Sequence, residues 1–262
     1  MTAWRLGLAL SLVFAVLLLA PGLVAPQSPL ALDTALALQP PSAAHWFGTD
    51  DVGRDVFARV VHGTRITLGL VTSSLLLALL LGGGLGVVAG FAGGWFDLAL
   101  ARLADMVQTF PPIIAGVMIT GVLGPGASNL VLALSVIYLP SFFRIGRSAA
   151  LAEAQLTYVE AARAAGFGEA AVLLRQVLPN TLPVLVLNFV ILFPLALQIE
   201  AALGFLGLGV LPPTPDWGAI LEQGKNFILV AWWMSLWPGV FVLASALAML
   251  LLGHGLRARL GR

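Results

Sequence analysis

The chain has 262 residues, of which 60% are hydrophobic and only 10% are charged, and its formal net charge is +1. A soluble domain needs about a quarter of its residues charged, so this composition excludes an ordinary soluble protein. The near-zero net charge argues against a nucleic-acid surface, and the absence of cysteine excludes disulfides and thiolate chemistry. The three histidines show no metal-ligand spacing, so we predict no catalytic, cofactor or metal site in this chain.

Charge-free runs predict the membrane-spanning helices, because about 20 apolar residues cross the hydrocarbon core. These runs are 6–24, 66–96, 106–143, 176–199 and 227–253. The run 106–143 is too long for one span, and a cluster of turn residues at 124–129 divides it in two. Lipid cannot pair with backbone groups, so each span must be helical. We therefore predict an all-α membrane protein with six transmembrane helices.

The first span admits two interpretations. Residues 1–25 form either a retained transmembrane anchor or a cleaved signal peptide with Arg5 at its charged start. Its apolar run of about 19 residues exceeds the usual signal-peptide length of about 7–15, which favours the anchor. An external loop at 26–65, a five-helix core at 66–253 and a tail at 254–262 complete the predicted organisation.

The placement of Lys and Arg orients the spans, since cytoplasmic segments carry the excess. With the N-terminus inside, the nine inner residues are Arg5, Arg102, Arg144, Arg147, Arg163, Arg175, Arg257, Arg259 and Arg262. The four outer ones are Arg54, Arg59, Arg65 and Lys225, and the three arginines alternate with Asp50, Asp51 and Asp55. We therefore predict that both termini are cytoplasmic.

The segment 160–179, EAARAAGFGEAAVLLRQVLP, is a charged and helix-prone stretch between two apolar runs. Thr157 and Glu160 have the spacing of a capping box, and Gly166 is placed to end the first helix. A second helical stretch at 169–177 leads into the next span. We predict a helix–turn–helix loop with small side chains exposed at the cytoplasmic mouth of the bundle.

This stretch resembles the E-A-A-x-x-x-G…L-P motif of the membrane subunits of ATP-binding-cassette (ABC) importers. The matching residues are Glu160, Ala161, Ala162, Gly166, Leu178 and Pro179, with Arg163 inside the motif. Gln176 departs from the pattern, because the family usually has an apolar residue there. The resemblance implies that the loop 151–179 contains a coupling helix that docks on an ATPase.

Other segments resemble the peptide and nickel branch of this family. The segment 47–55, FGTDDVGRD, is similar to the branch signature G-T-D-x-x-G-R-D, through Gly48, Thr49, Asp50, Gly53, Arg54 and Asp55. Residues 63–68, 93–97, 205–209 and 215–218 are similar to further segments of the same branch. The resemblance extends over most of the chain from residue 46 and is to the second, C-type dipeptide or oligopeptide permease.

The resemblance implies a type I importer bundle that moves peptides across the cytoplasmic membrane by alternating access. It implies four kinds of partner: a sister permease in a heterodimer, two cytoplasmic ATPase subunits, an external solute-binding protein and the lipid membrane. ATP and Mg are then expected on the ATPases. The chain itself has no Walker A loop, because its only lysine, Lys225, lacks the required glycine spacing and the following Ser or Thr.

Two alternatives remain for the solute and the energy source. Nickel or another small solute is compatible with the branch signature. An ion-coupled secondary transporter is the alternative from another class, but it needs carboxylates in the middle of spans, where this sequence has none.

Polar residues within the fifth span are candidates for the translocation pathway. Asn188 and Gln198 either line this pathway or bond a neighbouring helix. Glu200 is expected at the outer interface, where it contacts solute or the sister chain or is simply solvated. In the second span, a stripe of glycines at 82, 86 and 90 predicts close helix packing, within the bundle or against the sister permease.

Overall fold

The computed structural model describes residues 2–260, so Met1 and Arg262 of the predicted terminal segments lie outside the described residues. Apart from an isolated β-bridge between Thr49 and Asp55, the regular structure in this range is helical. The α-helices are α1 (Thr2–Leu19), α2 (Pro21–Val24), α3 (Val56–Ala78), α4 (Gly84–Ala92), α5 (Gly94–Gln108), α6 (Pro112–Leu123), α7 (Ala127–Glu153), α8 (Thr157–Ala164), α9 (Glu169–Val172), α10 (Leu178–Phe205), α11 (Trp217–Lys225) and α12 (Trp233–Leu260). A 3₁₀ turn, η1, covers Thr34–Leu36, and two π-helical turns, η2 (Leu79–Gly83) and η3 (Leu173–Val177), join α3 to α4 and α9 to α10.

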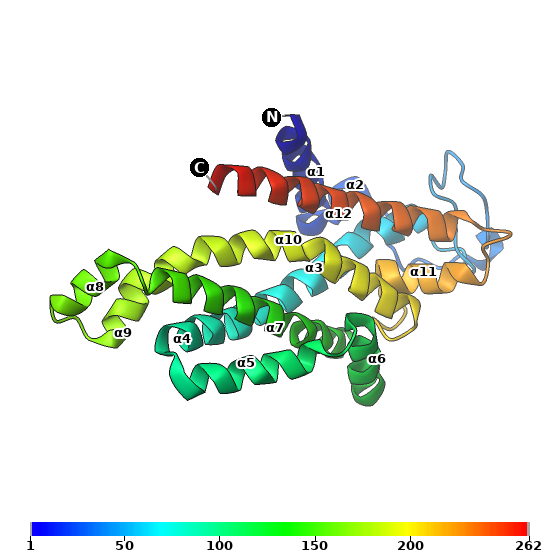
Figure 1. Ribbon diagram of the computed structural model, residues 1–262. Coiled ribbons are helices and arrows are strands. Elements are labelled where there is room, and N and C mark those ends of the chain that lie inside the picture. Colours follow the sequence, from blue (N-terminus) through cyan, green and yellow to red (C-terminus); the bar gives the residue numbers. More distant parts are fainter. Residues whose placement is uncertain (1, 261–262) are drawn as a thin grey trace.

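Four continuous helices of the described chain are long and apolar enough to cross a membrane: 56–92, 127–153, 169–205 and 233–259. The pair α5 and α6 makes a fifth if its two halves count together, although they are bent by 88°. Helix α1 is shorter and packs against α12. The contact is close, because a Cβ added at Gly7 would lie only 2.8 Å from the Cβ of Leu251. Figure 1 shows the long helices side by side.

Some helices begin or bend at residues other than those predicted, and a capping carboxylate and a pair of prolines account for two of these differences. Helix α3 begins at Val56, inside the segment predicted as external loop, because Asp55 caps it by accepting a 2.7 Å hydrogen bond from the Ala58 amide. Helix α12 begins at Trp233, later than predicted. The bend between α5 and α6 was not predicted, and it falls at Pro111 and Pro112, which remove backbone donors and restrict the preceding residues.

The predicted turn between the third and fourth spans is confirmed. Gly124 and Gly126 have φ angles of 86° and 147°, which favour glycine. The Asn129 side-chain amide donates to the carbonyl oxygens of Leu123 (2.8 Å) and Gly124 (3.0 Å), which satisfies acceptors at the end of α6.

The glycine stripe packs within the bundle. A Cβ added at Gly82, Gly86 or Gly90 would overlap a backbone carbonyl oxygen of α7. The absence of side chains at these positions therefore lets η2 and α4 lie directly against α7, as small residues do between membrane helices.

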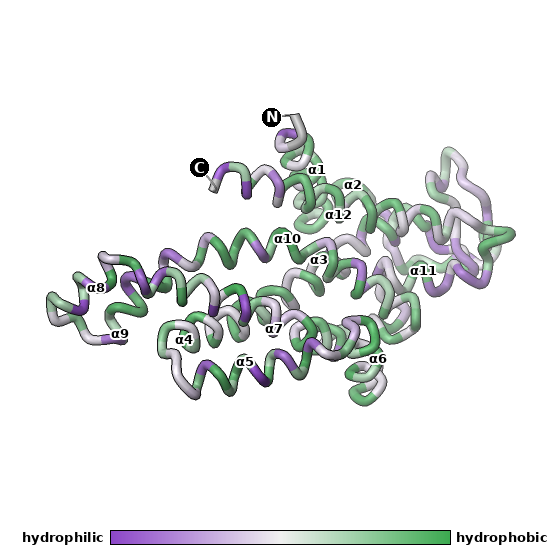
Figure 2. Tube along the Cα trace, viewed as in Figure 1, coloured by the Kyte–Doolittle hydropathy of each residue, from purple (hydrophilic) through white to green (hydrophobic). Residues whose placement is uncertain are grey.

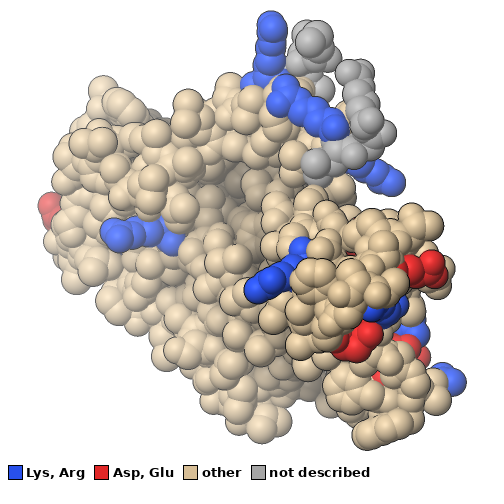
Figure 3. All heavy atoms as spheres, turned by 90° about the vertical axis from the view of Figure 1, so that its left-hand side faces the viewer, with Lys and Arg blue, Asp and Glu red and all other residues tan. Residues whose placement is uncertain are grey.

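Polar residues collect at the two ends of the bundle. Figure 2 shows hydrophilic residues around α8 and α9 at one end and around α11 and its neighbouring loop at the other, with apolar residues over α10 between them. Figure 3 faces the end that carries α8 and α9, and both Arg and acidic side chains lie on this surface. Figure 2 also shows hydrophilic residues along α5, so the apolar stretch between the two polar ends is clearest over α10.

Candidate functional site

The loop that carries the E-A-A motif is a helical hairpin at one end of the bundle (Figure 1). Gly166 ends α8 with a φ angle of 85°, as predicted. Its amide donates to the Arg163 carbonyl (3.0 Å), and the Phe167 amide donates to the Ala162 carbonyl (3.2 Å). These two bonds form a Schellman motif, which satisfies carbonyl groups that a helix end leaves free.

The start of α8 differs from the predicted capping box. Leu156 has the extended backbone of an N-cap, Thr157 is the first helical residue, and no side chain caps this end. The Thr157 side chain cannot act as the predicted cap, because its residue already has helical geometry. The N-cap position belongs instead to an apolar residue without a hydrogen-bonding side chain.

The motif residues of α8 are exposed, except that Ala162 is half-buried. Val159 is the only fully buried side chain of this helix. Arg163 forms hydrogen bonds of 3.0 and 3.1 Å with the Glu169 carboxylate, and its guanidinium lies 5.3 Å from the centre of the Phe91 ring. The surface of small side chains is thus free to meet another protein, while Arg163 holds α8 against α4 and α9.

Leu178 and Pro179 begin α10, directly after the π-helical turn η3. Pro179 lies within the continuous helix 169–205, just after the π-helical turn, and its ring nitrogen supplies no amide donor to the preceding turn. Gln176, the departure from the family pattern, is half-buried, and its carbonyl accepts a 2.8 Å bond from the Asn180 side chain. The hairpin therefore continues without a break into a membrane-length helix.

The G-T-D-x-x-G-R-D segment lies at the opposite end, and its charged residues form a buried network. One Asp50 oxygen accepts from Arg54 Nε (2.6 Å) and from Arg59 Nη1 (2.9 Å). Asp50 is 2% exposed and Arg59 is 1% exposed. Arg59 also donates to Gln223 Oε1 of α11 at 3.0 Å. Two of the arginines that alternate with aspartates in this segment are thus paired with the same carboxylate.

The remaining signature residues shape the same loop. Gly48 and Gly53 have φ angles of 73° and 78°, and a Cβ at Gly53 would overlap the Asp33 carbonyl oxygen. The Thr49 carbonyl accepts a 3.0 Å bond from Trp233 Nε1 of α12. Asp55 caps α3 and accepts a 2.8 Å bond from His45. The signature therefore fixes the loop that contains it against α3, α11 and α12.

A second polar contact joins α11 to α3. Thr67 Oγ1 donates to Asp216 at 2.6 Å and accepts from the Trp217 amide at 3.0 Å, and all three residues are buried. Sequence reasoning missed the roles of Thr67 and Gln223. The only sequence signal was that Thr67 falls in the 63–68 segment and Asp216 in the 215–218 segment, both of which resemble the branch.

The three pathway candidates of the fifth span lie in different environments. Asn188 donates a 2.8 Å bond to the Val184 carbonyl of its own helix, and Gln198 is exposed. Glu200, expected at the outer interface and solvated, is fully buried beside Asp216, and neither carboxyl oxygen has a hydrogen-bond partner in the described chain. The structure therefore does not bring the three residues together in one site.

The burial of Glu200 follows from a close contact between α10 and α11. A Cβ at Gly204 would lie 2.7 Å from the Gly218 Cα, and a Cβ at Gly218 would lie 2.8 Å from the Gly204 Cα. Two glycines thus let the helices touch, and α11 covers the carboxyl group one turn away. The sequence prediction used only the position of Glu200 along the helix, which places it near solvent. That estimate does not include a second helix that covers the side chain.

Comparison with known proteins connects these features. The family described as "Binding-protein-dependent transport system inner membrane component" matches residues 82–262, which is more than half of the chain. The chain belongs to this family. It is an ABC importer permease, a membrane component of a transport system rather than a catalytic subunit.

Two relatives and one solved structure support the assignment. The permease is 39% identical over 240 residues to the di/tripeptide transport system permease protein DppC of Pseudomonas aeruginosa, covering 89% of this chain and 79% of the relative. It is 38% identical over 220 residues to the dipeptide transport system permease protein DppC of Alkalihalophilus pseudofirmus, covering 84% and 72%. A structure of the MetNI methionine ABC transporter in inward-facing conformations matches with a TM-score of 0.62 and 22% identity, over 76% of this chain and 95% of that chain. This last match shows that the fold is shared.

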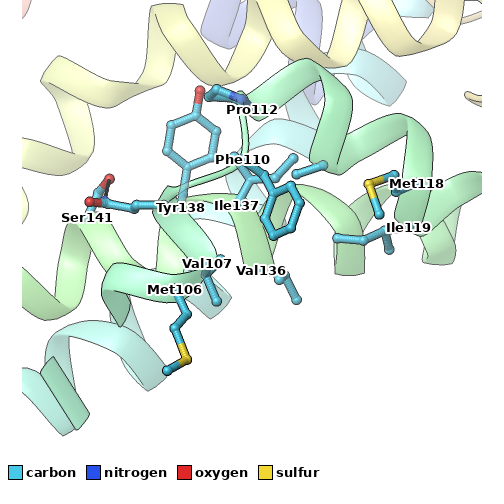
Figure 4. Close-up of a pocket in the computed structure, with 12 residues that line it drawn as sticks. Met106, Val107, Phe110, Pro112, Met118, Ile119, Val136, Ile137, Tyr138 and Ser141 are labelled. Carbon is cyan, nitrogen blue, oxygen red and sulfur yellow. Dashed lines mark hydrogen bonds between the residues drawn. The ribbon is translucent and has the colours of Figure 1, made fainter. Parts of the chain in front are cut away.

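The permease also has an apolar cavity of about 530 Å³ at the bend between α5 and α6. Figure 4 shows side chains from α5, the linking segment, α6 and α7 around it, among them Met106, Phe110, Met118 and Tyr138. Two residues of its lining are polar and contact each other, with Gln108 Nε2 donating a 3.3 Å hydrogen bond to Ser141 Oγ. Sequence reasoning missed this cavity, because it lies between α5, α6 and α7 at a bend that the sequence did not predict.

Proposed function

We propose that this permease carries small peptides inward across the cytoplasmic membrane, driven by ATP hydrolysis on partner subunits. Support for the solute class comes from the two relatives, whose names specify dipeptides and di/tripeptides. The cavity beside α5 and α6 has the size and largely apolar lining of a small-molecule site. Asn188 and Gln198 remain proposed contributors to the pathway. Glu200 is not proposed as part of the pathway surface, because its side chain is buried.

The observation that carries the coupling role is the exposed hairpin of α8 and α9. Glu160, Ala161 and Gly166 are exposed at its surface, and only Val159 anchors α8 in the core. Small exposed side chains allow close approach of a partner backbone, and Glu160 and Arg163 add polar contacts at the edge. We infer that a cytoplasmic ATPase binds this surface, with Leu178 and Pro179 at the junction that continues into α10.

Transport then follows because the ATPases bind two conformational states of the permease with different affinities. When the ATPases close on ATP, they displace the hairpin, and the π-helical turn passes this motion into α10 because the helix is continuous. The permease moves between inward-open and outward-open states as the ATPases favour one of them. ATP and Mg bind to the ATPases in this scheme.

The proposed membrane arrangement has six spans and cytoplasmic termini. In addition to the four continuous helices, α1 and the bent pair α5–α6 each cross once. The hairpin then faces the cytoplasm, and α11 with the signature loop faces outward, toward a solute-binding protein. A sister permease completes the pathway. Because the chain has no cysteine, single-cysteine labelling from each side reports this topology without background.

The first test is purification of the permease from its native membrane in a mild detergent, with all co-purifying proteins identified. We expect a second permease and two ATPase subunits bearing Walker A loops. Added solute-binding proteins loaded with dipeptides should then stimulate ATP hydrolysis. Recovery of the permease alone, under conditions that preserve other ABC importers, would refute the assembly.

Two substitutions test the docking surface. Gly166→Trp and Glu160→Lys should leave membrane insertion intact but separate ATP hydrolysis from transport, because they alter the surface that meets the ATPase. Transport activity in proteoliposomes and the amount of bound ATPase are the readouts. Normal transport in both variants would remove the hairpin from the mechanism.

A further inference from the structure

Tyr158 makes a polar contact that the E-A-A motif does not include. Its hydroxyl donates to the carboxylate of Glu153, the last residue of α7, and accepts a 2.8 Å hydrogen bond from the side chain of Asn180 in the first turn of α10. The same Asn180 nitrogen donates to the Gln176 carbonyl at 2.8 Å. One hydroxyl in α8 thus joins the ends of two membrane-length helices.

The Tyr158 contact fixes the orientation of α8, which the buried side chain of Val159 does not fix. A single buried side chain, Val159, fixes where the helix sits but leaves it free to turn about that point. Hydrogen bonds are directional, so the two bonds of Tyr158 fix how α8 is oriented relative to α7 and α10. The other end of α8 is held separately, by Arg163 against Glu169 and Phe91.

The hydroxyl is suited to remain a donor in this position. Partial burial, together with the hydrogen bond to Glu153, raises the pKa of Tyr158 above its ordinary value. Like any tyrosine, the side chain carries its proton at neutral pH, and its bond to the Glu153 carboxylate is of the stronger, charge-assisted kind.

We propose that Tyr158 is a positioning residue that passes displacement of α8 to α7 and α10 together, so that the two helices move as one unit. This inference rests on the proposed ATPase docking of the hairpin, but it concerns the contacts of α8 with α7 and α10 rather than those with the ATPase. Helix α7 lines the cavity at the α5–α6 bend, and α10 carries the pathway candidates. Joint movement of these helices is what a change of access to that region requires.

A purely stabilising contact makes a different prediction from a transmitting one. Loss of a stabilising contact lowers the amount of folded permease and leaves the assembled complexes working normally. Loss of a transmitting contact leaves assembly intact and reduces the solute moved for each ATP hydrolysed. The ratio of transport to hydrolysis therefore distinguishes them.

The experiment uses the complete importer in proteoliposomes, with Tyr158→Phe, Asn180→Ala and the double variant. We expect wild-type amounts of bound ATPase in all three. The ratio of dipeptide transported to ATP hydrolysed should fall about threefold or more in each, as expected when a hydrogen bond that couples two states is lost. The double variant should be no worse than the single ones, because both changes break the same link.

Gln155→Ala is the matched control, since Gln155 is exposed in the same loop and should leave the ratio unchanged. An unchanged ratio in Tyr158→Phe would overturn the proposal. Loss of bound ATPase in Tyr158→Phe would also overturn it, by assigning Tyr158 to the docking surface. If the wild-type importer itself retains no ATPase, the proposed function fails first, and this inference fails with it.

Discussion

The two ends of the permease are stabilised in different ways. At the end that carries the signature loop and α11, Asp50 and Arg59 are almost fully buried and bonded to α11, and Thr67 joins Asp216 to α3. At the hairpin end, the ion pair of Arg163 and Glu169 is solvent-exposed, and one valine anchors α8. Buried polar networks are costly to break, whereas exposed ones exchange easily with water. The contrast suits a signature-loop end that keeps its shape and a hairpin whose contacts adjust to a partner.

The largest expected effect comes from removing the centre of the Asp50 network. Asp50→Ala leaves Arg54 and Arg59 buried without their shared partner, which typically costs about 3–5 kcal/mol. Thermal unfolding of the purified permease in detergent should show a large loss of stability. Asp51→Ala is the control, because Asp51 is exposed and lies 3.9 Å from Arg54, so a similar loss there would contradict the assignment.

The second effect concerns the link between α3 and α11. Thr67→Val keeps the shape of the side chain but removes its bonds to Asp216 and to the Trp217 amide, at a cost of about 1–3 kcal/mol. Thr67→Ser retains the hydroxyl and should restore most of the stability in the same unfolding assay. Equal stability of the two variants would show that the hydroxyl does not hold the helices together.

A smaller effect is expected at the turn of the hairpin. Gly166→Ala places a Cβ on a residue with a φ angle of 85°, which costs about 1–2 kcal/mol. Gly168→Ala is matched to it, since Gly168 has a φ angle of −67° and no atom near a new Cβ. Hydrogen exchange of the α8 amides should become faster in the first variant only. Equal exchange in both would argue against strain at Gly166.

The smallest effect is expected for the exposed ion pair. Arg163→Gln should lower the free energy of unfolding by about 0.2–1 kcal/mol at most, because exposed pairs contribute little. A double-mutant cycle with Glu169→Gln measures this coupling directly. A coupling as large as that of the Asp50 network would erase the contrast between the two ends.

Much of the hairpin end was predictable from local sequence. Gly166 ends a helix because of its own backbone freedom, and the apolar run after Pro179 forms a long helix because of its composition. The capping role assigned to Thr157 was wrong, since the helix begins one residue earlier than a capping box requires, with Leu156 at the N-cap position. Helix ends depend on small shifts in backbone geometry that spacing alone does not specify.

By itself, the sequence determined the membrane class, the helical architecture, the family motifs and the turn at Gly124 and Gly126. These features depend on composition or on residues close together in the chain. Only the tertiary structure decided that Asp50 pairs with Arg59, that Thr67 meets Asp216, and that α11 covers Glu200. Such contacts join residues far apart in sequence, and they exist because packed helices bring particular side chains together and exclude water from them.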